Sequence, residues 1–354
     1  MPNELAQAYR AQRDAEMDVA ERARAALHTA GWDALYDATQ HSPLSILAGP
    51  AAGHDRYLPD FAIDVVQEGI ATPLHVLVAA DGSQVMPDSR HRYPLAAVQA
   101  ASVTMQSGRQ VRVIFRQWDP DHPAIVEILM SGERGKKLAG MVETLRDVEE
   151  LILLSDTCAS TQPDHEVLVA LPDGPLHIYR PSDVSVRAPI YAAIRNLPAY
   201  LAGVVDRGEA KYVSGTLARA TGDETFATVR DGDLFGHLLP GQRSVLFSIA
   251  SPSNTRLARL AGWKVGFFYL NPGEGLLRVE TTTDMTFSEV QQLARIIMDA
   301  SAGLNYPYIL QKAHEYAEIS GPMRQHLTRK HTASLMALAL ADDLMSHKEA
   351  LKAL

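Results

Sequence analysis

The stretch Leu74-His-Val-Leu-Val-Ala-Ala-Asp81-Gly-Ser83 decides the fold class, and His165-Glu-Val-Leu-Val-Ala-Leu-Pro-Asp173-Gly-Pro-Leu176 repeats its pattern. Each stretch is a short apolar run that stops at an aspartate followed by glycine, which predicts a buried strand ending in a turn. A carboxylate at the end of a buried strand is costly unless it is paired or binds a metal. Asp-Gly is also a common turn dipeptide, so an ordinary turn remains the alternative at each place.

The rest of the chain mixes strand-like and helix-like patterns. Alternating or short apolar runs predict strands over 95–105, 111–117, 244–249, 265–270 and 276–281. Apolar residues at spacings of three and four predict helices over 4–29, 136–156, 188–206, 286–302, 307–319 and 332–353, while 122–130 fits a strand or a helix start. This mixture predicts one α/β domain with helical extensions at both ends.

Composition and charge exclude several classes of protein. The chain has 354 residues and a single cysteine, Cys158, so neither an internal disulfide nor a cysteine-rich metal site is possible. No apolar run reaches the roughly 18 residues that a membrane helix needs, and the N-terminus lacks a signal peptide, so we expect no membrane partner and a cytoplasmic location. The net charge of −9 argues against nucleic acid as a partner, unless basic side chains cluster locally.

Several other residues are candidates for chemistry with the two aspartates. Carboxylates select hard cations such as Mg²⁺ or Mn²⁺, and two such ions can flank a phosphate. The helix over 136–156 offers Glu143, Glu149 and Glu150 as a third acid, although a solvated helix face explains each of them equally well. Farther along the chain, His314 could carry a proton or bind a metal; the alternative is an ordinary surface histidine.

The order of these motifs resembles the NurA family of nucleases. Asp81-Gly-Ser83 and Asp173-Gly-Pro-Leu176 are followed by Tyr306-Pro-Tyr and His314-Glu315, in the order seen in that family. Weaker phrases that also fit are Ala202–Arg207, Gly241–Phe247, Phe267–Leu270 and Arg278–Glu280. The resemblance covers roughly residues 70–320, and it departs from the family where Pro175 replaces the commoner serine.

The resemblance implies a fold and a domain plan. It implies a ribonuclease H-like mixed sheet flanked by helices, with helical N- and C-terminal extensions. The corresponding division is an N-terminal helical extension over 1–65, a nuclease core over 66–320 and a C-terminal helical extension over 321–354.

The resemblance also implies an activity and a set of site residues. NurA proteins form ring-like homodimers, cut DNA with Mn²⁺ or Mg²⁺, and work with the hexameric ATPase HerA in resection of double-strand breaks. Their activities are those of a 5′-to-3′ exonuclease and a single-strand endonuclease. The implied metal ligands are Asp81, Glu150, Asp173 and His314, with Tyr306 positioning the phosphate; Glu149 and Glu143 remain alternatives to Glu150.

Two other functions fit the same residues. The chain is either a non-catalytic dimeric adaptor of a ring ATPase, using the C-terminal stripe of Leu335, Leu338, Leu344, Met345 and Leu351, or a metal-dependent hydrolase of small phosphoesters. If the chain cuts DNA despite its net charge of −9, we expect weak unaided binding that falls steeply with salt.

Overall fold

The computed structural model describes the chain over most of its length. The described residues are 2–40, 47–50, 62–65, 72–87, 95–106, 108–161, 166–178, 181–197, 199–206, 209–273 and 275–337. The predicted helix over 332–353 therefore falls largely outside the described residues, as do Leu338, Leu344, Met345 and Leu351 of its apolar stripe.

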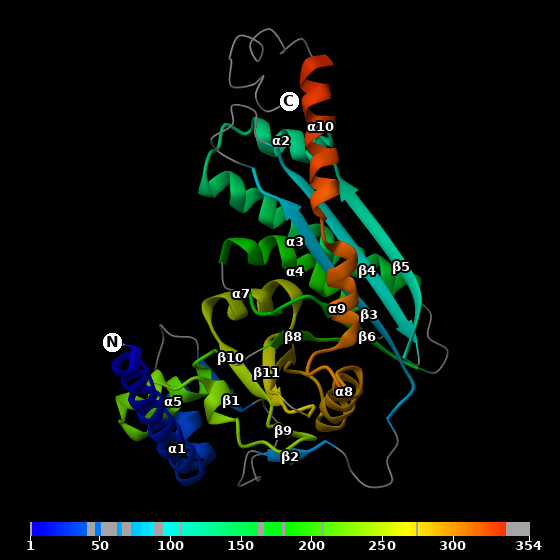
Figure 1. Ribbon diagram of the computed structural model, residues 1–354. Helices are drawn as coiled ribbons and strands as arrows, with labels where there is room; N and C mark the ends of the chain where they lie inside the picture. The colour runs from blue at the N-terminus through cyan, green and yellow to red at the C-terminus, as the bar shows by residue number, and fades with distance from the viewer. Residues whose placement is uncertain are drawn as a thin grey trace.

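A five-stranded mixed sheet carries the two aspartate motifs (Figure 1). Its order is β5-β4-β3-β6-β7, with bounds Arg109–Trp118, Ala97–Gln106, His75–Val85, Val167–Pro172 and Ala199–Leu201. The first three strands form an antiparallel meander, whereas β6 is parallel to both β3 and β7. Because β3 and β6 are parallel and Ala80 pairs with Pro172, Asp173 at the carboxyl end of β6 lies beside Asp81 of the longer strand β3.

Helices cover both faces of this sheet. Because successive residues of β3 point to opposite faces, Val76 and Val78 pack in one core cluster while Leu77 and Ala79 pack in another. Helix α3 (Lys136–Ser160) packs on the first face, and α9 (Tyr308–Ala317) packs on the second. The shorter helices α2 (Pro123–Met130) and α4 (Pro181–Arg195) lie against α3.

Strands from both ends of the chain form a second sheet; the sequence predicted some of its strands but not a separate sheet. Its order is β1-β10-β11-β12-β8, and β2 and β9 pair at its margin, with bounds Leu47–Pro50, Phe247–Ala250, Val265–Leu270, Leu277–Thr282, Gly203–Asp206, Ala62–Asp64 and Gln242–Ser244. All of these pairings are antiparallel. A bridge between Asp173 and Val204 joins the end of β6 to β8, so the two sheets meet beside the second aspartate motif.

The remaining helices pack around the second sheet or extend from the ends. They are α1 (Pro2–Gln40), α5 (Tyr212–Thr221), η1 (Glu224–Thr228), α6 (Asp231–Leu234), α7 (Pro252–Ala261), α8 (Phe287–Ala300) and α10 (Gly321–Ala337). Residues 5–18 of α1 are exposed, as predicted, but Ala23 and Leu27 are buried because the second half of the helix packs against α5. The predicted division at residues 65 and 320 stays a prediction.

One predicted element differs from the structure, and one ambiguous segment is resolved by it. The predicted helix over 188–206 is wrong beyond Arg195, because α4 ends there and β7 and β8 follow. A proline at position 198 of the sequence explains the break, since it disfavours helical backbone at the residue before it. The ambiguous segment 122–130 is helical, with His122 capping α2. Among the described residues, no helix is long and apolar enough to cross a membrane.

Candidate active site

Asp81 lies inside β3 rather than at its end. The strand continues through Asp81 and Gly82 to Val85, and both residues stay in register with β4, so the predicted turn at this Asp-Gly is wrong. The glycine serves close packing instead. A Cβ at Gly82 would lie 2.7 Å from Cγ of Arg146 on α3, so the absent side chain lets the helix approach the strand. The Asp81 side chain is 2% exposed, and one of its oxygens accepts a hydrogen bond from the Gly82 amide.

Asp173 directly follows β6, and the chain turns there, as predicted. Gly174 has a φ of +82°, a left-handed conformation that glycine adopts without strain, so the predicted turn is confirmed here. The Asp173 amide donates to the carbonyl of Ala80 at 3.0 Å, which places the residue directly beside Asp81 on the neighbouring strand. The two aspartates therefore lie side by side, at the carboxyl end of β6.

The residues at the start and middle of α9 reach these aspartates from the opposite face. Nδ1 of His314 lies 2.8 Å from Oδ2 of Asp81, and the histidine side chain is 72% exposed while the aspartate is buried. The hydroxyl of Tyr306, just before the helix, donates to Oδ1 of Asp173 at 3.2 Å. The structure thus brings both predicted C-terminal residues to the two aspartates.

Of the three candidate glutamates, Glu150 is the one near the aspartates. It is buried, and its carboxylate accepts a hydrogen bond from the Asp173 amide at 3.2 Å. Glu149 is only partly buried and lies near Arg116. Glu143 precedes Glu150 by seven residues on α3 and lines the same cavity as Glu150 and Asp173, but the hydrogen bond to the Asp173 amide is made by Glu150. The role of Glu150 as a metal ligand stays a prediction, but its position is the one that such a role requires.

Burial and like charge both act on these carboxyl groups. Burial, followed by the charge of Asp81, raises the pKa of Glu150 well above its usual range. Partial burial and the same charge also raise the pKa of Asp173, although the Tyr306 hydroxyl counteracts this. Burial and the neighbouring Asp173 raise the pKa of Tyr306, so its phenol stays protonated and remains a hydrogen-bond donor.

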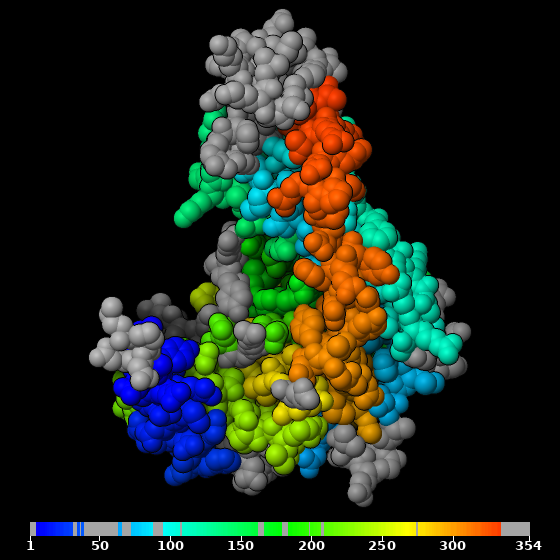
Figure 2. All heavy atoms as spheres, viewed as in Figure 1, coloured from blue at the N-terminus to red at the C-terminus, as the bar shows by residue number. Residues whose placement is uncertain are grey.

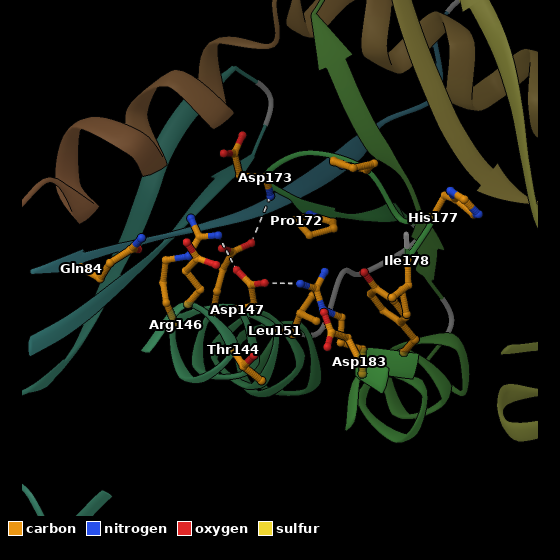
Figure 3. Close-up of a pocket in the computed structure, with 15 residues that line it drawn as sticks. Gln84, Thr144, Arg146, Asp147, Leu151, Pro172, Asp173, His177, Ile178 and Asp183 are labelled. Atoms are coloured by element: carbon orange, nitrogen blue, oxygen red, sulfur yellow. Dashed lines mark hydrogen bonds and ion pairs between the residues drawn. The ribbon is translucent and has the colours of Figure 1, made fainter. Parts of the chain in front are cut away.

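A cavity of about 310 Å³ opens beside the acids. Glu150 and Asp173 form part of its lining, together with Arg146, Asp147 and Arg187. In the space-filling view the surface is hollowed beside the orange helix α9, with green residues from the middle of the chain at the bottom of the hollow (Figure 2). The close-up shows Asp173 on the sheet side and Arg146 and Asp147 on α3 across from it (Figure 3).

The donors of this cluster fit a hard divalent cation by their chemistry. Three carboxylates and one imidazole suit Mg²⁺ or Mn²⁺, and a cation would offset the mutual repulsion that raises the pKa of Glu150. Within the described residues, however, no group of three or more His, Cys, Asp or Glu side chains is close enough together to hold a metal ion. Their oxygens are held instead by the Gly82 and Asp173 amides and by His314.

Sequence reasoning missed two residues of this site. Asp147 forms ion pairs with both Arg146 and Arg187, so it connects α3 to α4 across the floor of the cavity. No local motif marks either Asp147 or Arg187, because each is an ordinary charged residue on a predicted helix. The periodicity of α3 was the available signal, since Arg146 and Glu150 are four residues apart on one face.

Comparisons with known proteins agree with this fold. Residues 75–319 match the family model described as the NurA domain. The crystal structure of the NurA nuclease from Sulfolobus solfataricus aligns with a TM-score of 0.53 at 14% identity, covering 77% of this chain and 87% of that chain. The catalytic domain of human endonuclease V aligns with a TM-score of 0.38 at 15% identity, over 73% of this chain and 84% of that chain. No curated protein matches the sequence. The predicted ribonuclease H-like α/β fold is confirmed by the strand order and by the first of these alignments.

Proposed function

Since the chain belongs to the NurA family, we propose that it is a divalent-metal-dependent DNA nuclease that hydrolyses phosphodiester bonds at this cluster. The observation that carries the proposal is the convergence of Asp81, Glu150 and Asp173 from two strands and a helix, with His314 on Asp81. Three buried or half-buried carboxyl groups at one edge of a sheet are costly for the fold, and a cation-binding role explains their proximity.

The proposed ligands of Mn²⁺, or of Mg²⁺ in its place, are Asp81, Glu150, Asp173 and His314. When bound, such an ion neutralises phosphate charge and lowers the pKa of coordinated water. A bound cation would favour the ionised form of Glu150, so metal binding is expected to release protons and to strengthen as the pH rises. Cleavage is therefore expected to need chelatable metal and to be lost in EDTA.

Asp81 orients His314 for proton transfer. Because a carboxylate oxygen accepts hydrogen bonds, we assign the donor role in the contact between Asp81 and His314 to Nδ1–H. The other ring nitrogen, Nε2, then carries a lone pair. Because the His314 side chain is largely exposed, it is accessible to a water molecule or to the leaving oxygen of a substrate. His314 is proposed as the proton carrier of the reaction if it is not itself a metal ligand.

Tyr306 holds Asp173 and is proposed to position the phosphate. Its hydroxyl donates to one oxygen of Asp173, which fixes the orientation of that carboxylate. The raised pKa of Tyr306 keeps the hydroxyl protonated, so it can donate to a phosphate oxygen in place of the carboxylate.

Three basic side chains that could attract DNA are already paired within the protein. Arg112 and Arg116 on β5 bind Ser160 and Asp156 at the end of α3, and Lys330 on α10 binds Asp119. With a net charge of −9, weak unaided binding to DNA is therefore expected, and its salt dependence measures the number of phosphates contacted.

The test is cleavage of labelled single-stranded DNA with Mn²⁺, with and without EDTA. Asp81→Asn and Asp173→Asn are expected to lower the rate at least about a hundredfold while the fold is kept. Asp156→Asn is the matched control, because Asp156 is exposed on the same helix as Glu150 and pairs with Arg116. Undiminished cleavage by either site variant would contradict the proposal.

The same assay separates the two alternatives. A non-catalytic adaptor of a ring ATPase leaves DNA uncut under every metal condition. A hydrolase of small phosphoesters cleaves p-nitrophenyl phosphate, with the same dependence on Asp81, and leaves DNA uncut. The family suggests 5′-to-3′ exonucleolytic cleavage from DNA ends and endonucleolytic cleavage of single strands. The sizes of the labelled products show which of these cleavage modes occurs.

We also propose a HerA-type hexameric ATPase as partner, a homodimer as the working unit and a role in end resection, on family membership alone. Co-purification with the ATPase tests the partnership, and analytical sedimentation tests the homodimer. The exposed first half of α1 is the candidate contact surface, with Leu5 76% and Tyr9 73% exposed. Deletion of residues 2–17 removes this surface and spares the buried residues Ala23 and Leu27, so it is expected to abolish co-purification without unfolding the core.

A further inference from the structure

Arg146 lies beside the acid cluster, although arginine is not a metal ligand. Its aliphatic stem packs on β3 at Gly82, where a Cβ would approach Cγ and Cδ of Arg146 to 2.7 and 3.2 Å. Its Nη1 donates to the Gly82 carbonyl at 3.3 Å, next to Asp81 in the strand. Glu150 follows one helical turn later on the same face of α3. The guanidinium is thus fixed between the strand and the helix that supply carboxylates.

A second set of contacts holds Arg146 from the other side. The two oxygens of Asp147 bind Arg146 and Arg187 separately, and the Asp147 side chain is only 17% exposed. Because Arg187 comes from α4, the network joins two helices and limits the conformations of Arg146 (Figure 3). A charge that is fixed in this way acts on its neighbours without an entropic cost for each interaction.

The charges around Arg146 are complementary to its own. Although burial acts to lower it, the pKa of Arg146 is raised by the carboxylates of Asp147 and Glu150. The packing brings these charges together: the position of a Cβ at Gly82 is 2.7 Å from Cγ of Arg146 and 3.3 Å from Oε2 of Glu150, so the Arg146 side chain and the Glu150 carboxylate pack at the same place on β3, next to Asp81. A positive charge at this place offsets part of the repulsion among the acids.

We infer that Arg146 is a built-in counter-charge of the acid cluster, which holds the carboxylates together in the metal-free protein and weakens their affinity for a divalent cation. It is a positioning residue, because it acts through Glu150 and Asp81. The inference rests on the metal requirement in the proposed function. A fixed positive charge repels a divalent ion that approaches the same acids, so removal of the charge is expected to tighten binding roughly tenfold.

The test uses Arg146→Met, which keeps an unbranched stem over Gly82 and removes the charge. Mn²⁺ binding is measured by isothermal titration calorimetry, and the melting temperature is measured without metal. The variant is expected to bind Mn²⁺ roughly tenfold more tightly than the wild type and to melt about 4 °C lower when metal-free. Arg146→Lys restores the charge and is expected to return both values most of the way.

Arg116→Met is the matched control. Arg116 also pairs with a carboxylate of α3, Asp156, but at the exposed end of the helix, so neither Mn²⁺ affinity nor melting temperature is expected to change measurably. A purely structural role for Arg146 predicts a lower melting temperature without tighter Mn²⁺ binding, and that result would overturn the inference.

A phosphate-binding role for Arg146 predicts a different result. In that case Arg146→Met leaves Mn²⁺ affinity unchanged, weakens DNA binding and lowers the salt slope by about one. This outcome also overturns the inference. None of these readouts requires cleavage, so tighter Mn²⁺ binding by a protein that fails to cut DNA would contradict the proposed function and leave the counter-charge intact.

Discussion

Gly82→Ala tests the close packing on which the site depends. The added Cβ would lie 2.7 Å from Cγ of Arg146, 3.2 Å from its Cδ and 3.3 Å from Oε2 of Glu150. Real Cβ contacts are rarely shorter than about 3.4 Å, because the repulsion rises steeply below that distance. Arg146 has little room to retreat, since Asp147 and Gly82 itself hold its guanidinium.

The expected cost follows from this geometry. Overpacking a rigid site typically costs about 1–3 kcal/mol, and the backbone at Gly82 is ordinary strand, so no additional strain from a left-handed conformation is involved. Alanine recovers part of that loss, since glycine in a strand interior is itself unfavourable by about 0.5–1 kcal/mol. The net loss in the free energy of unfolding is therefore expected to be about 1–2 kcal/mol.

The assay is urea unfolding, with cleavage of single-stranded DNA measured in parallel. Gly140→Ala is the control, because Gly140 lies on the same helix as Arg146 and a Cβ there has nothing within 4 Å. We expect that control to be more stable than the wild type by about 0.5–1 kcal/mol. Cleavage by Gly82→Ala is expected to fall at least about tenfold, because a shift of the acids by a fraction of an ångström disturbs the reaction geometry. A Gly82→Ala protein as stable as the Gly140→Ala control would refute the packing argument.

Three other changes have defined outcomes. Burial lowers the pKa of His177 to about 4, whereas a histidine in the unfolded chain takes up a proton near pH 6.5. The free energy of unfolding is therefore expected to fall by about 2 kcal/mol from pH 7 to pH 5. In urea unfolding at several pH values, His177→Gln should lack this contribution to the pH dependence of stability. Tyr306→Phe removes the donor to Asp173 and is expected to lower kcat about tenfold with little change in KM, in steady-state assays. Asp231→Asn disrupts a buried carboxylate that accepts from three backbone amides, including that of Ser214, so urea unfolding should show a loss of about 2–3 kcal/mol with unchanged cleavage per folded molecule.

Four of the five strands of the first sheet, β3 to β6, were predictable because their residues alternate or form short apolar runs, whereas β7 was predicted as helix. The role of Gly82 was not, since Asp-Gly looks the same in a turn as in a strand that a helix approaches closely. Only the position of Arg146 across from Gly82 distinguishes the two. The Asp-Gly at Asp173 has the usual turn conformation. The inference from Asp-Gly to a turn was therefore wrong at Asp81 and right at Asp173.

The choice among the glutamates came from the family resemblance, and the structure adds a physical reason for it. Glu150 lies eight residues after Val142 and four after Arg146, in line with the buried stripe of α3, whereas Glu149 is displaced from it. The second sheet was beyond such reasoning. Its strands pair across long separations, such as β1 with β10, and nothing in a local pattern specifies the partner of a strand.

The contact between Asp81 and His314 joins residues that are 233 positions apart. The strands and the helix that supply the carboxylates are all complete by residue 173, so they leave the ribosome long before α9 has been made. A nascent or truncated chain that stops before Tyr308 carries all three acids and lacks the histidine. If His314 carries the proton, the site is therefore completed only by one of the last helices of the chain to be made, and a chain that stops before Tyr308 lacks its proton carrier.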